Sequence, residues 1–245
     1  MLKKETFSIY DKLRNIKIPK KSKKLAEFFG ILYGDGYLIN RGRIHRIGIT
    51  LNLKEDLFYA KYVKKLIEDL FNLKPTIKHR EKYGSLEIII HSKIIANFIL
   101  SFDFPSGYKK DKLKIPSWII ENKIFLKAFL RGVFDTDGSL FFAKRGTYKR
   151  NEYPVIEIKI HDKIFINQLE ISLKSLGFDC IRAENKVQLN GKSWMEKWMD
   201  EIGTKNMNQL SRYLVWKRFK YCPLKTNLME RLNLISSDGR NIRLL

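Results

Sequence analysis

Two aspartates, each followed directly by a glycine, are the residues of this 245-residue chain whose type and spacing suggest chemistry. Asp35 lies at the end of the apolar run LAEFFGILYGDGYL, and Asp137 lies 102 residues later at the end of LKAFLRGVFDTDGSL. A single Asp-Gly pair is typical of a helix end or a hairpin turn and predicts no function. A matched pair at domain spacing indicates an internal repeat, which can bring the two carboxylates to one place.

Small residues spaced by four indicate how the two apolar runs would meet if both are helices. Gly30 and Gly34 have this spacing in the first run, and Gly132 and Thr136 have it in the second. Residues four apart lie on the same helix face, and small side chains there permit close backbone approach. Two helices packed on these faces would bring their C-terminal ends together and place the two aspartates side by side.

Two neighbouring carboxylates repel each other, and the negative end of each helix dipole adds to the repulsion. Either one carboxylate is protonated or a cation lies between them. Hard oxygen ligands on both sides suit Mg²⁺. A divalent ion shared by two carboxylates on a basic surface is an arrangement for phosphodiester hydrolysis, because the ion lowers the pKa of bound water and stabilises charge in the transition state.

The elements that must position these acids follow the same order in both halves. Residues 43–52 and 155–161 alternate between apolar and polar side chains, which is the period of a half-buried strand. Residues 57–71 and 162–176 have the apolar spacing of amphipathic helices. With the remaining strands, each half is predicted to be an α-β-β-α-β-β-α unit, so the fold class is α+β with two pseudo-symmetric units.

Composition shifts predict the boundaries of five segments. They are a basic N-terminal arm at residues 1–24, a first unit at 25–101, a linker rich in proline, glycine and lysine at 102–118, a second unit at 119–234, and a C-terminal tail at 235–245. The arm carries nine basic residues against two acidic ones and is expected to be mobile. The tail is expected to be loosely held.

The charge of the chain favours a polyanionic partner. The 48 basic and 26 acidic residues give a net charge of +22, and nucleic acid is the leading partner because phosphate neutralisation releases counterions. An anionic membrane surface is the competing partner, but the sequence lacks the long, one-sided basic helix that such binding requires. A base-composition bias or a hot habitat could also explain the abundance of lysine, although not its placement.

No membrane partner or secretion is expected. No stretch approaches about 18 uncharged apolar residues, and the N-terminal residues contain no apolar signal segment. Cys180 and Cys222 form no metal-ligand pair and are interpreted as thiols in a reducing compartment. We therefore expect an intracellular protein, in the cytoplasm of a prokaryote or in an organelle matrix.

The segments FFGILYGDG (Phe28–Gly36) and LRGVFDTDG (Leu130–Gly138) resemble the two motifs of a LAGLIDADG homing endonuclease. The resemblance extends over the two-unit architecture, roughly residues 22–215. It implies a monomer that acts on a long, imperfectly palindromic DNA site. Each unit would lay a curved antiparallel sheet, half of a DNA-binding saddle, into the major groove. The enzyme would use Mg²⁺ to cut both strands and leave short 3′ overhangs, with Mn²⁺ able to substitute and Ca²⁺ binding without supporting cleavage.

The resemblance also implies the metal ligands. The acids at the eighth motif position, Asp35 and Asp137, would be catalytic and would bind the metal. The backbone carbonyls of the seventh position, Gly34 and Thr136, would contribute further oxygen ligands.

The motifs depart from the family pattern at two positions. Tyr33 occupies the sixth position of the first motif, where the family has Asp, and Thr136 occupies a position where Ala or Gly is commoner. Neither departure removes an eighth-position acid. Asp135 lies two residues from Asp137 and cannot share its helix face, so we interpret it as a structural hydrogen-bonding residue.

Auxiliary groups that order water and offset charge are implied as well. With 48 basic residues in the chain, a phosphate contact or a solvated surface is the simpler interpretation of any single lysine. The candidates are Asn52 in the first unit, His161 or Lys159 in the second, Lys109 or Lys110 after the first sheet, and Lys217 or Lys225 after the second.

DNA sequence would be read by the polar faces of the strands. Arg and Lys pair with guanine edges, and Gln and Asn pair with adenine. The alternative for each residue is a solvated sheet face. The candidates are Arg41, Arg46, Thr50, Lys78 and Arg80 in the first unit, and Lys159, Arg182, Lys186, Gln188 and Asn190 in the second.

Two other functions are compatible with the same motifs. The first is an intron maturase, for which the partner would be the host intron RNA. The second is a non-catalytic DNA-binding regulator, a class that typically loses the two acids. We do not expect an intein, because the chain has neither a splicing Cys or Ser at its start nor a terminal His-Asn.

Overall fold

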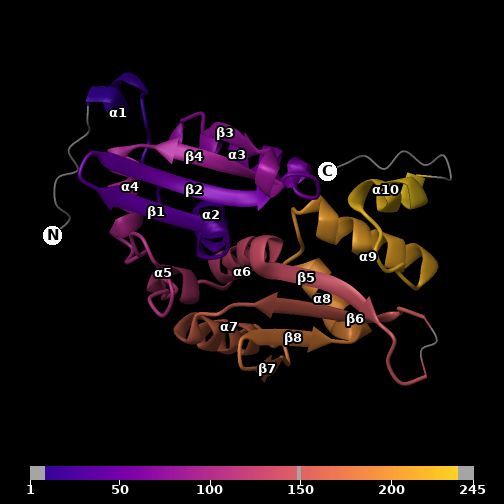
Figure 1. Cartoon of the computed structure of the whole chain (residues 1–245). Coiled ribbons are helices and arrows are strands. Elements are labelled where there is room, and N and C mark those ends of the chain that lie inside the picture. The colour runs from indigo at the N-terminus through magenta and orange to yellow at the C-terminus, as the bar shows by residue number, and fades with distance from the viewer. Residues whose placement is uncertain (1–8, 148–149, 237–245) are drawn as a thin grey trace.

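Two four-stranded antiparallel sheets lie one above the other, with a pair of helices between them (Figure 1). The computed structural model describes residues 9–147 and 150–236. The central helices are α2 (Lys23–Tyr33) and α6 (Lys123–Asp137). Each begins the same succession of strands and helices, which confirms the predicted α+β fold of two repeated units.

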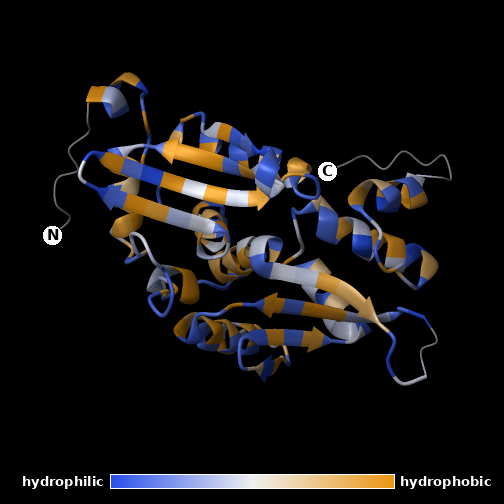
Figure 2. Ribbon diagram, viewed as in Figure 1, coloured by the Kyte–Doolittle hydropathy of each residue, from blue (hydrophilic) through white to orange (hydrophobic). Residues whose placement is uncertain are grey.

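The first unit has the sheet order β1-β2-β4-β3. Along its strands hydrophobic and hydrophilic residues alternate (Figure 2), and Ile47, Ile49 and Leu51 of the second strand are buried in the core beside the helices. The opposite, largely polar face of this sheet is called the outer face below. After α2, the elements are β1 (Gly36–Arg41), β2 (Ile44–Asn52), α3 (Leu57–Phe71), β3 (Thr76–Arg80), the 3₁₀ turn η1 (Glu81–Tyr83), β4 (Ser85–His91) and α4 (Lys93–Leu100).

The second unit has the matching sheet order β5-β6-β8-β7 and extends beyond the repeat by two helices that pack together. No helix in the described part of the chain is long and apolar enough to cross a bilayer. The elements are α5 (Ser117–Ile120), α6, β5 (Gly138–Ala143), β6 (Tyr153–Lys159), α7 (Lys163–Ser175), β7 (Ile181–Ala183), β8 (Lys186–Asn190), α8 (Lys192–Glu201), α9 (Met207–Phe219) and α10 (Leu228–Ser236).

The helices α2 and α6 touch through their backbones, as the spacing of their small residues predicts. A Cβ atom added to Gly30 would lie 2.1 Å from the carbonyl oxygen of Phe129, and one added to Gly132 would lie 2.4 Å from the carbonyl oxygen of Glu27. Such distances are far inside van der Waals contact, so neither position can carry a side chain without separating the helices. The glycines therefore fix how closely the two units meet.

Residues 9–22 of the N-terminal arm are packed against the first unit, in contrast to the expected mobility. Helix α1 (Ile9–Leu13) carries the buried Asp11, whose Oδ1 accepts a 2.8 Å hydrogen bond from the Ser92 hydroxyl. Ile16 joins the core. Burial of these side chains anchors a segment that composition alone marks as solvated; residues 1–8 lie outside the described residues.

The start of the predicted tail is also ordered. Helix α10 includes residues 235 and 236, and Arg218 donates a 2.8 Å hydrogen bond to the carbonyl oxygen of Ile235. The rest of the predicted tail, residues 237–245, lies outside the described residues.

Candidate active site

The two motif aspartates come together where α2 and α6 end. Asp137 is the last residue of α6, and Asp35 follows α2 after one residue, Gly34. A Cβ atom on Gly34 would lie 3.1 Å from Asp137 Oδ2 and 2.0 Å from the Thr136 hydroxyl. The missing side chain of Gly34 therefore lets the carboxylate of one unit approach the motif backbone of the other.

The raised pKa values of the two acids agree with their closeness. Burial first, and then the charges of Asp137 and Asp56, raise the pKa of Asp35 to about 7. Burial raises the pKa of Asp137 to about 6, although Lys109 and His161 lower it. A cation between these carboxylates would relieve the cost of keeping both charged.

The donor set fits a hard divalent ion. Among the described residues, no group of three or more His, Cys, Asp and Glu side chains could hold a metal. An ion at this site would therefore rest on Asp35 and Asp137, on helix-end carbonyls, and on water or phosphate oxygens. Mg²⁺ suits such a set, because it binds oxygen and usually keeps several of its waters. The residues present thus fit the ion that the sequence predicts.

Lys109 reaches the C-terminal end of α2. Its Nζ donates to the carbonyl oxygens of Leu32 at 3.3 Å, Tyr33 at 3.2 Å and Gly34 at 2.6 Å. These carbonyls have no partner inside the helix and form the negative end of its dipole. Burial lowers the pKa of Lys109, opposed by the two motif acids, and its charge in turn lowers the pKa of both acids.

Side chains of both units hold the linker that carries Lys109. Asp162, the N-cap residue directly before α7, accepts hydrogen bonds from the backbone N–H groups of Lys112 at 3.1 Å and Leu113 at 3.2 Å. The hydroxyl of Tyr33 donates to the carbonyl oxygen of Lys114 at 2.6 Å. The residue that departs from the family pattern at the sixth motif position therefore anchors the linker.

A cavity of about 450 Å³ opens beside Asp137 and collects several predicted auxiliary residues. Lys109, Lys110, Lys159 and His161 all line it. Lys217 lies in α9 and Lys225 follows α9, and neither lines this cavity. The lining is completed by Tyr33, Gly34, Tyr37, Gly107, Tyr108, Leu113, Ile160 and Asp162.

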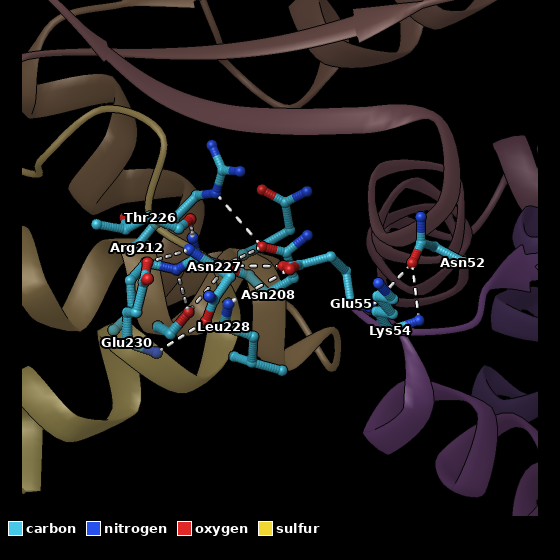
Figure 3. Close-up of polar contacts among 12 residues, drawn as sticks. Asn52, Lys54, Glu55, Asn208, Arg212, Thr226, Asn227, Leu228 and Glu230 are labelled. Atoms are coloured by element: carbon cyan, nitrogen blue, oxygen red, sulfur yellow. Dashed lines mark hydrogen bonds and ion pairs between the residues drawn. The ribbon is translucent and has the colours of Figure 1, made fainter. Parts of the chain in front are cut away.

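Asn52 does not line this cavity. Its Oδ1 accepts hydrogen bonds from the backbone N–H groups of Lys54 and Glu55, each at 2.9 Å (Figure 3). An Asn that bonds the backbone two and three residues ahead forms a turn, which here leads into α3. The structure gives Asn52 this local role, and its predicted water-positioning role is not supported by the geometry.

Asp56 is a site residue that the sequence analysis missed. Its charge raises the pKa of Asp35, and its Oδ1 accepts a 2.8 Å hydrogen bond from Asn206 Nδ2. Asn206 Nδ2 also donates to the carbonyl oxygen of Asp135 at 2.9 Å, so it connects the first unit to α6. An aspartate directly before the first apolar residue of a helix is a recognised start signal, but it carries no hint of a partner 150 residues away.

Asp135 is structural, as predicted. Its carboxylate accepts hydrogen bonds from the Thr204 hydroxyl and from the backbone N–H of Lys205, the latter at 2.8 Å. These partners lie in the loop before α9.

The C-terminal helices hold the two units together near the site (Figure 3). The guanidinium of Arg231, buried on α10, pairs with Glu55 of the first unit at 3.2 Å. It also donates to the Ser211 hydroxyl at 2.9 Å. Leu228 donates its backbone N–H to Glu55 at 3.4 Å. The turn that begins with Asn52 is therefore tied to α9 and α10.

Most of the predicted DNA-contacting residues share the exposed face of their sheet. The register pairs Thr50 with Glu87 and Glu87 with Lys78, and residues directly opposite each other project from the same face. By the same rule, all five candidates of the first unit lie on the outer face. In the second sheet the rule places Lys159, Lys186, Gln188 and Asn190 on one face.

Arg182 is the exception, and the prediction for it is wrong. It pairs with the buried Val187, so it lies on the opposite face from Lys186 and Gln188. Its guanidinium contacts Asn167 and Glu170 of α7, the latter at 3.3 Å. The register of the short β7–β8 hairpin decides this orientation.

Comparisons with known proteins identify the architecture. Residues 125–213 match the model of the LAGLIDADG-like domain. The structure of meganuclease I-SmaMI bound to uncleavable DNA superposes with a TM-score of 0.55 at 14% sequence identity, over 81% of this chain and 91% of that one. The chain has the LAGLIDADG homing-endonuclease fold. It contains both α/β units of that fold in one polypeptide.

Other proteins share this LAGLIDADG scaffold. Mesophilic variants of the homing endonuclease I-DmoI superpose with a TM-score of 0.50 at 19% identity, over 74% of this chain and 95% of that one. The N-terminal LAGLIDADG domain of DUF199/WhiA reaches 0.52 at 16% identity, over 83% and 93%. These identities show the fold alone, so function must be argued from the site.

One curated relative matches part of this chain in sequence. A segment of 122 residues is 34% identical to the replication factor C small subunit of Methanocaldococcus jannaschii. The match covers 49% of this chain and 6% of that protein, so the chain spans only a small part of its length.

The raised pKa values predict how the metal-free protein responds to pH. An acid whose pKa rises on folding destabilises the folded state once pH exceeds its unfolded pKa, and this cost grows until pH passes the folded pKa of about 7 for Asp35. Replacing Asp35 by Asn should therefore stabilise the metal-free protein at pH 8, on the order of 1–2 kcal/mol after solvent screening, and should have little effect at pH 4. Thermal denaturation in EDTA at both pH values tests this, and equal melting temperatures at pH 8 would contradict it.

Proposed function

We propose that the protein is a site-specific double-strand DNA endonuclease of a mobile intron. The observation that carries the proposal is the pairing of Asp35 with Asp137, one from each unit, at the joined ends of the motif helices. The fold supports it, because I-SmaMI with this fold was solved on its uncleaved DNA target in the presence of calcium ions. The net charge of +22 and the two polar sheet faces supply the surface for the duplex.

Asp35 and Asp137 would hold the metal, with the backbone carbonyls of Gly34 and Thr136 as further ligands. The Gly34 carbonyl would exchange its hydrogen bond from Lys109 for the ion. Bound Mg²⁺ would polarise the scissile phosphate and lower the pKa of a coordinated water. Lys109 keeps positive charge beside both carboxylates and thereby favours their ionised forms. Lys109 or Lys110, and His161 or Lys159, all of which line the cavity, would orient water and offset charge on the phosphate.

The monomeric state and the asymmetric target follow from the two-unit design, whereas the overhangs and the metal preferences are what the resemblance to LAGLIDADG homing endonucleases implies. The enzyme acts as a monomer, because one chain supplies both acids. Its target is long and asymmetric, because the two sheets carry different side chains. Cleavage leaves short 3′ overhangs, Mn²⁺ substitutes for Mg²⁺, and Ca²⁺ supports binding without cleavage.

Selection of cleaved sites from a random DNA library with Mg²⁺ tests the proposed function. We expect one asymmetric consensus whose cutting needs both acids. Enrichment of bound but uncut DNA would favour a non-catalytic regulator on the same scaffold. The maturase alternative predicts faster splicing of a host intron RNA when the protein is added, and the geometry of the two acids offers no support for that activity.

Lys109 and Lys110 make a matched pair for testing which lysine serves the site. Only Lys109 bonds the end of α2, whereas Lys110 is exposed although it lines the same cavity. Lys109→Met should reduce the cleavage rate by about 10²-fold, and should move the acid limb of the pH–rate profile to higher pH, because the pKa of both acids rises. Lys110→Met should leave the profile in place. Equal effects of the two changes would reduce Lys109 to an ordinary phosphate contact.

A further inference from the structure

A buried glutamate lies in the middle of the outer face of the first sheet, where the proposed function puts DNA. Glu87 projects from the central strand β4, opposite Thr50 of β2 and Lys78 of β3, and its side chain is only 1% exposed. A negative charge on a surface that binds phosphate repels the phosphate, so its presence there calls for an explanation. The side chains that contact Glu87 provide this explanation.

Three side chains from three strands converge on this carboxylate. Arg46 of β2 donates to Oε1 at 2.8 Å, Arg80 of β3 donates to Oε2, and the Tyr37 hydroxyl of β1 also donates to Oε1. Burial raises the pKa of Glu87, but the hydrogen bond from Tyr37 and the two arginines outweigh it, so the pKa lies below its ordinary value. The carboxylate is therefore charged at neutral pH, and the cluster of Tyr37, Arg46, Arg80 and Glu87 has a net charge of +1.

Gly48 creates the space in which this cluster forms. A Cβ atom at this position would lie 2.3 Å from the ring of Tyr37, so the ring crosses the strand only because residue 48 has no side chain. The Arg46 guanidinium lies over the same ring, 5.7 Å from its centroid. The Nε atom of Arg46 is buried and has no hydrogen-bond partner.

The donors that remain on the arginines suit base edges. Each arginine contributes one terminal nitrogen to Glu87. The N–H groups of its other terminal nitrogen and the second N–H of the bonded one can pair with the O6 and N7 atoms of guanine, whereas the buried Nε of Arg46 cannot. A phosphate contact tolerates many guanidinium orientations, whereas a bidentate contact to a guanine edge requires one planar orientation. The shared carboxylate limits the rotamers of both arginines, which reduces the entropy lost when a base is bound.

We propose that Glu87 is a positioning residue for DNA sequence recognition, which holds Arg46 and Arg80 so that both guanidinium groups meet guanine edges in the half-site bound by the first unit. This inference rests on the proposed function. The second sheet offers an internal comparison: Glu157 of β6 accepts hydrogen bonds from Lys186 at 2.9 Å and Gln188 at 2.6 Å. The two half-sites would then differ in sequence.

Binding selection from a random duplex library in EDTA tests the inference without using cleavage. In Glu87→Gln we expect discrimination at one or two G·C pairs of one half-site to fall about tenfold, while affinity for non-specific DNA stays equal or rises because a negative charge is lost. Glu157→Gln, the matched control, should leave those pairs unchanged and alter the other half-site. Arg80→Lys keeps the charge at a partly exposed position but loses the planar fork of donors. It should therefore lose discrimination at one of the same pairs, and this test remains available if Glu87→Gln folds poorly.

A Glu87→Gln profile that keeps every wild-type preference while all affinities rise together would overturn the inference and leave only a surface charge effect. So would an Arg80→Lys profile identical to that of the wild type. If the wild type itself enriches no sequence, the proposed function falls first and the inference falls with it. If the wild type selects a specific sequence and the variants select the same sequence, the inference about Glu87 fails while the proposed function stands.

Discussion

Replacing Asp35 or Asp137 by Asn is expected to abolish DNA cleavage, with a rate loss of at least 10²- to 10³-fold, on the order expected when a preorganised electrostatic group is removed. The amide keeps the size of the side chain but cannot carry the charge that holds a divalent ion. Each unit supplies one acid, so neither single change should be rescued by the other residue. Cleavage of a plasmid that carries the selected target measures the effect.

DNA binding serves as the companion measurement for these variants. Affinity for the target in EDTA should be unchanged or slightly higher, because each substitution removes a negative charge from a DNA-facing site. Asp200→Asn, an exposed change on α8, is the matched control and should cut normally. Wild-type cutting by Asp35→Asn would show that the catalytic ion, if any, is held elsewhere.

Gly30→Ala is expected to destabilise the protein strongly although alanine favours helices. The new Cβ would meet the backbone of α6, 2.1 Å from the Phe129 oxygen, and backbone cannot rotate away as a side chain can. The cost should reach or exceed the roughly 1–3 kcal/mol that is typical of an overpacked core, and it opposes a helix-propensity gain of about 0.5–1 kcal/mol. Urea denaturation measures the change in the free energy of unfolding.

Gly42→Ala is the matched control for Gly30→Ala. An added Cβ there meets nothing within 4 Å, and only the positive φ of 58° is at stake. About 1–2 kcal/mol is expected for this change. If Gly30→Ala were as stable as the wild type, the close contact between α2 and α6 would not exist in solution, and the acids would not be held together.

The sequence predicts the repeat, the strands and the meeting of the two acids because these depend on local spacing. The alternation along residues 43–52 and the small residues of the motif helices are visible without any tertiary contact. Arg182 shows where such reasoning stops. Alternation divides a strand into two faces, but only the pairing of Arg182 with Val187 decides which face meets the helices.

Long-range contacts explain the other differences. The sequence does not distinguish the neighbouring residues Lys109 and Lys110. The hydrogen bonds of Asp162 and Tyr33 to the linker fix its path, and this path brings Lys109 to the end of α2. Asp56 joins the site through Asn206 of the second unit. The packing of α1 through Asp11 likewise depends on a partner 81 residues away.

Titration of the protein–DNA complex with Ca²⁺, followed by calorimetry, tests the central claim most directly, namely that the two acids hold one divalent ion together. Ca²⁺ is chosen so that the DNA stays intact. We predict saturable binding by the wild type and the loss of that binding in Asp35→Asn and in Asp137→Asn alike. Wild-type affinity for Ca²⁺ in either single variant would contradict a site shared between the two units.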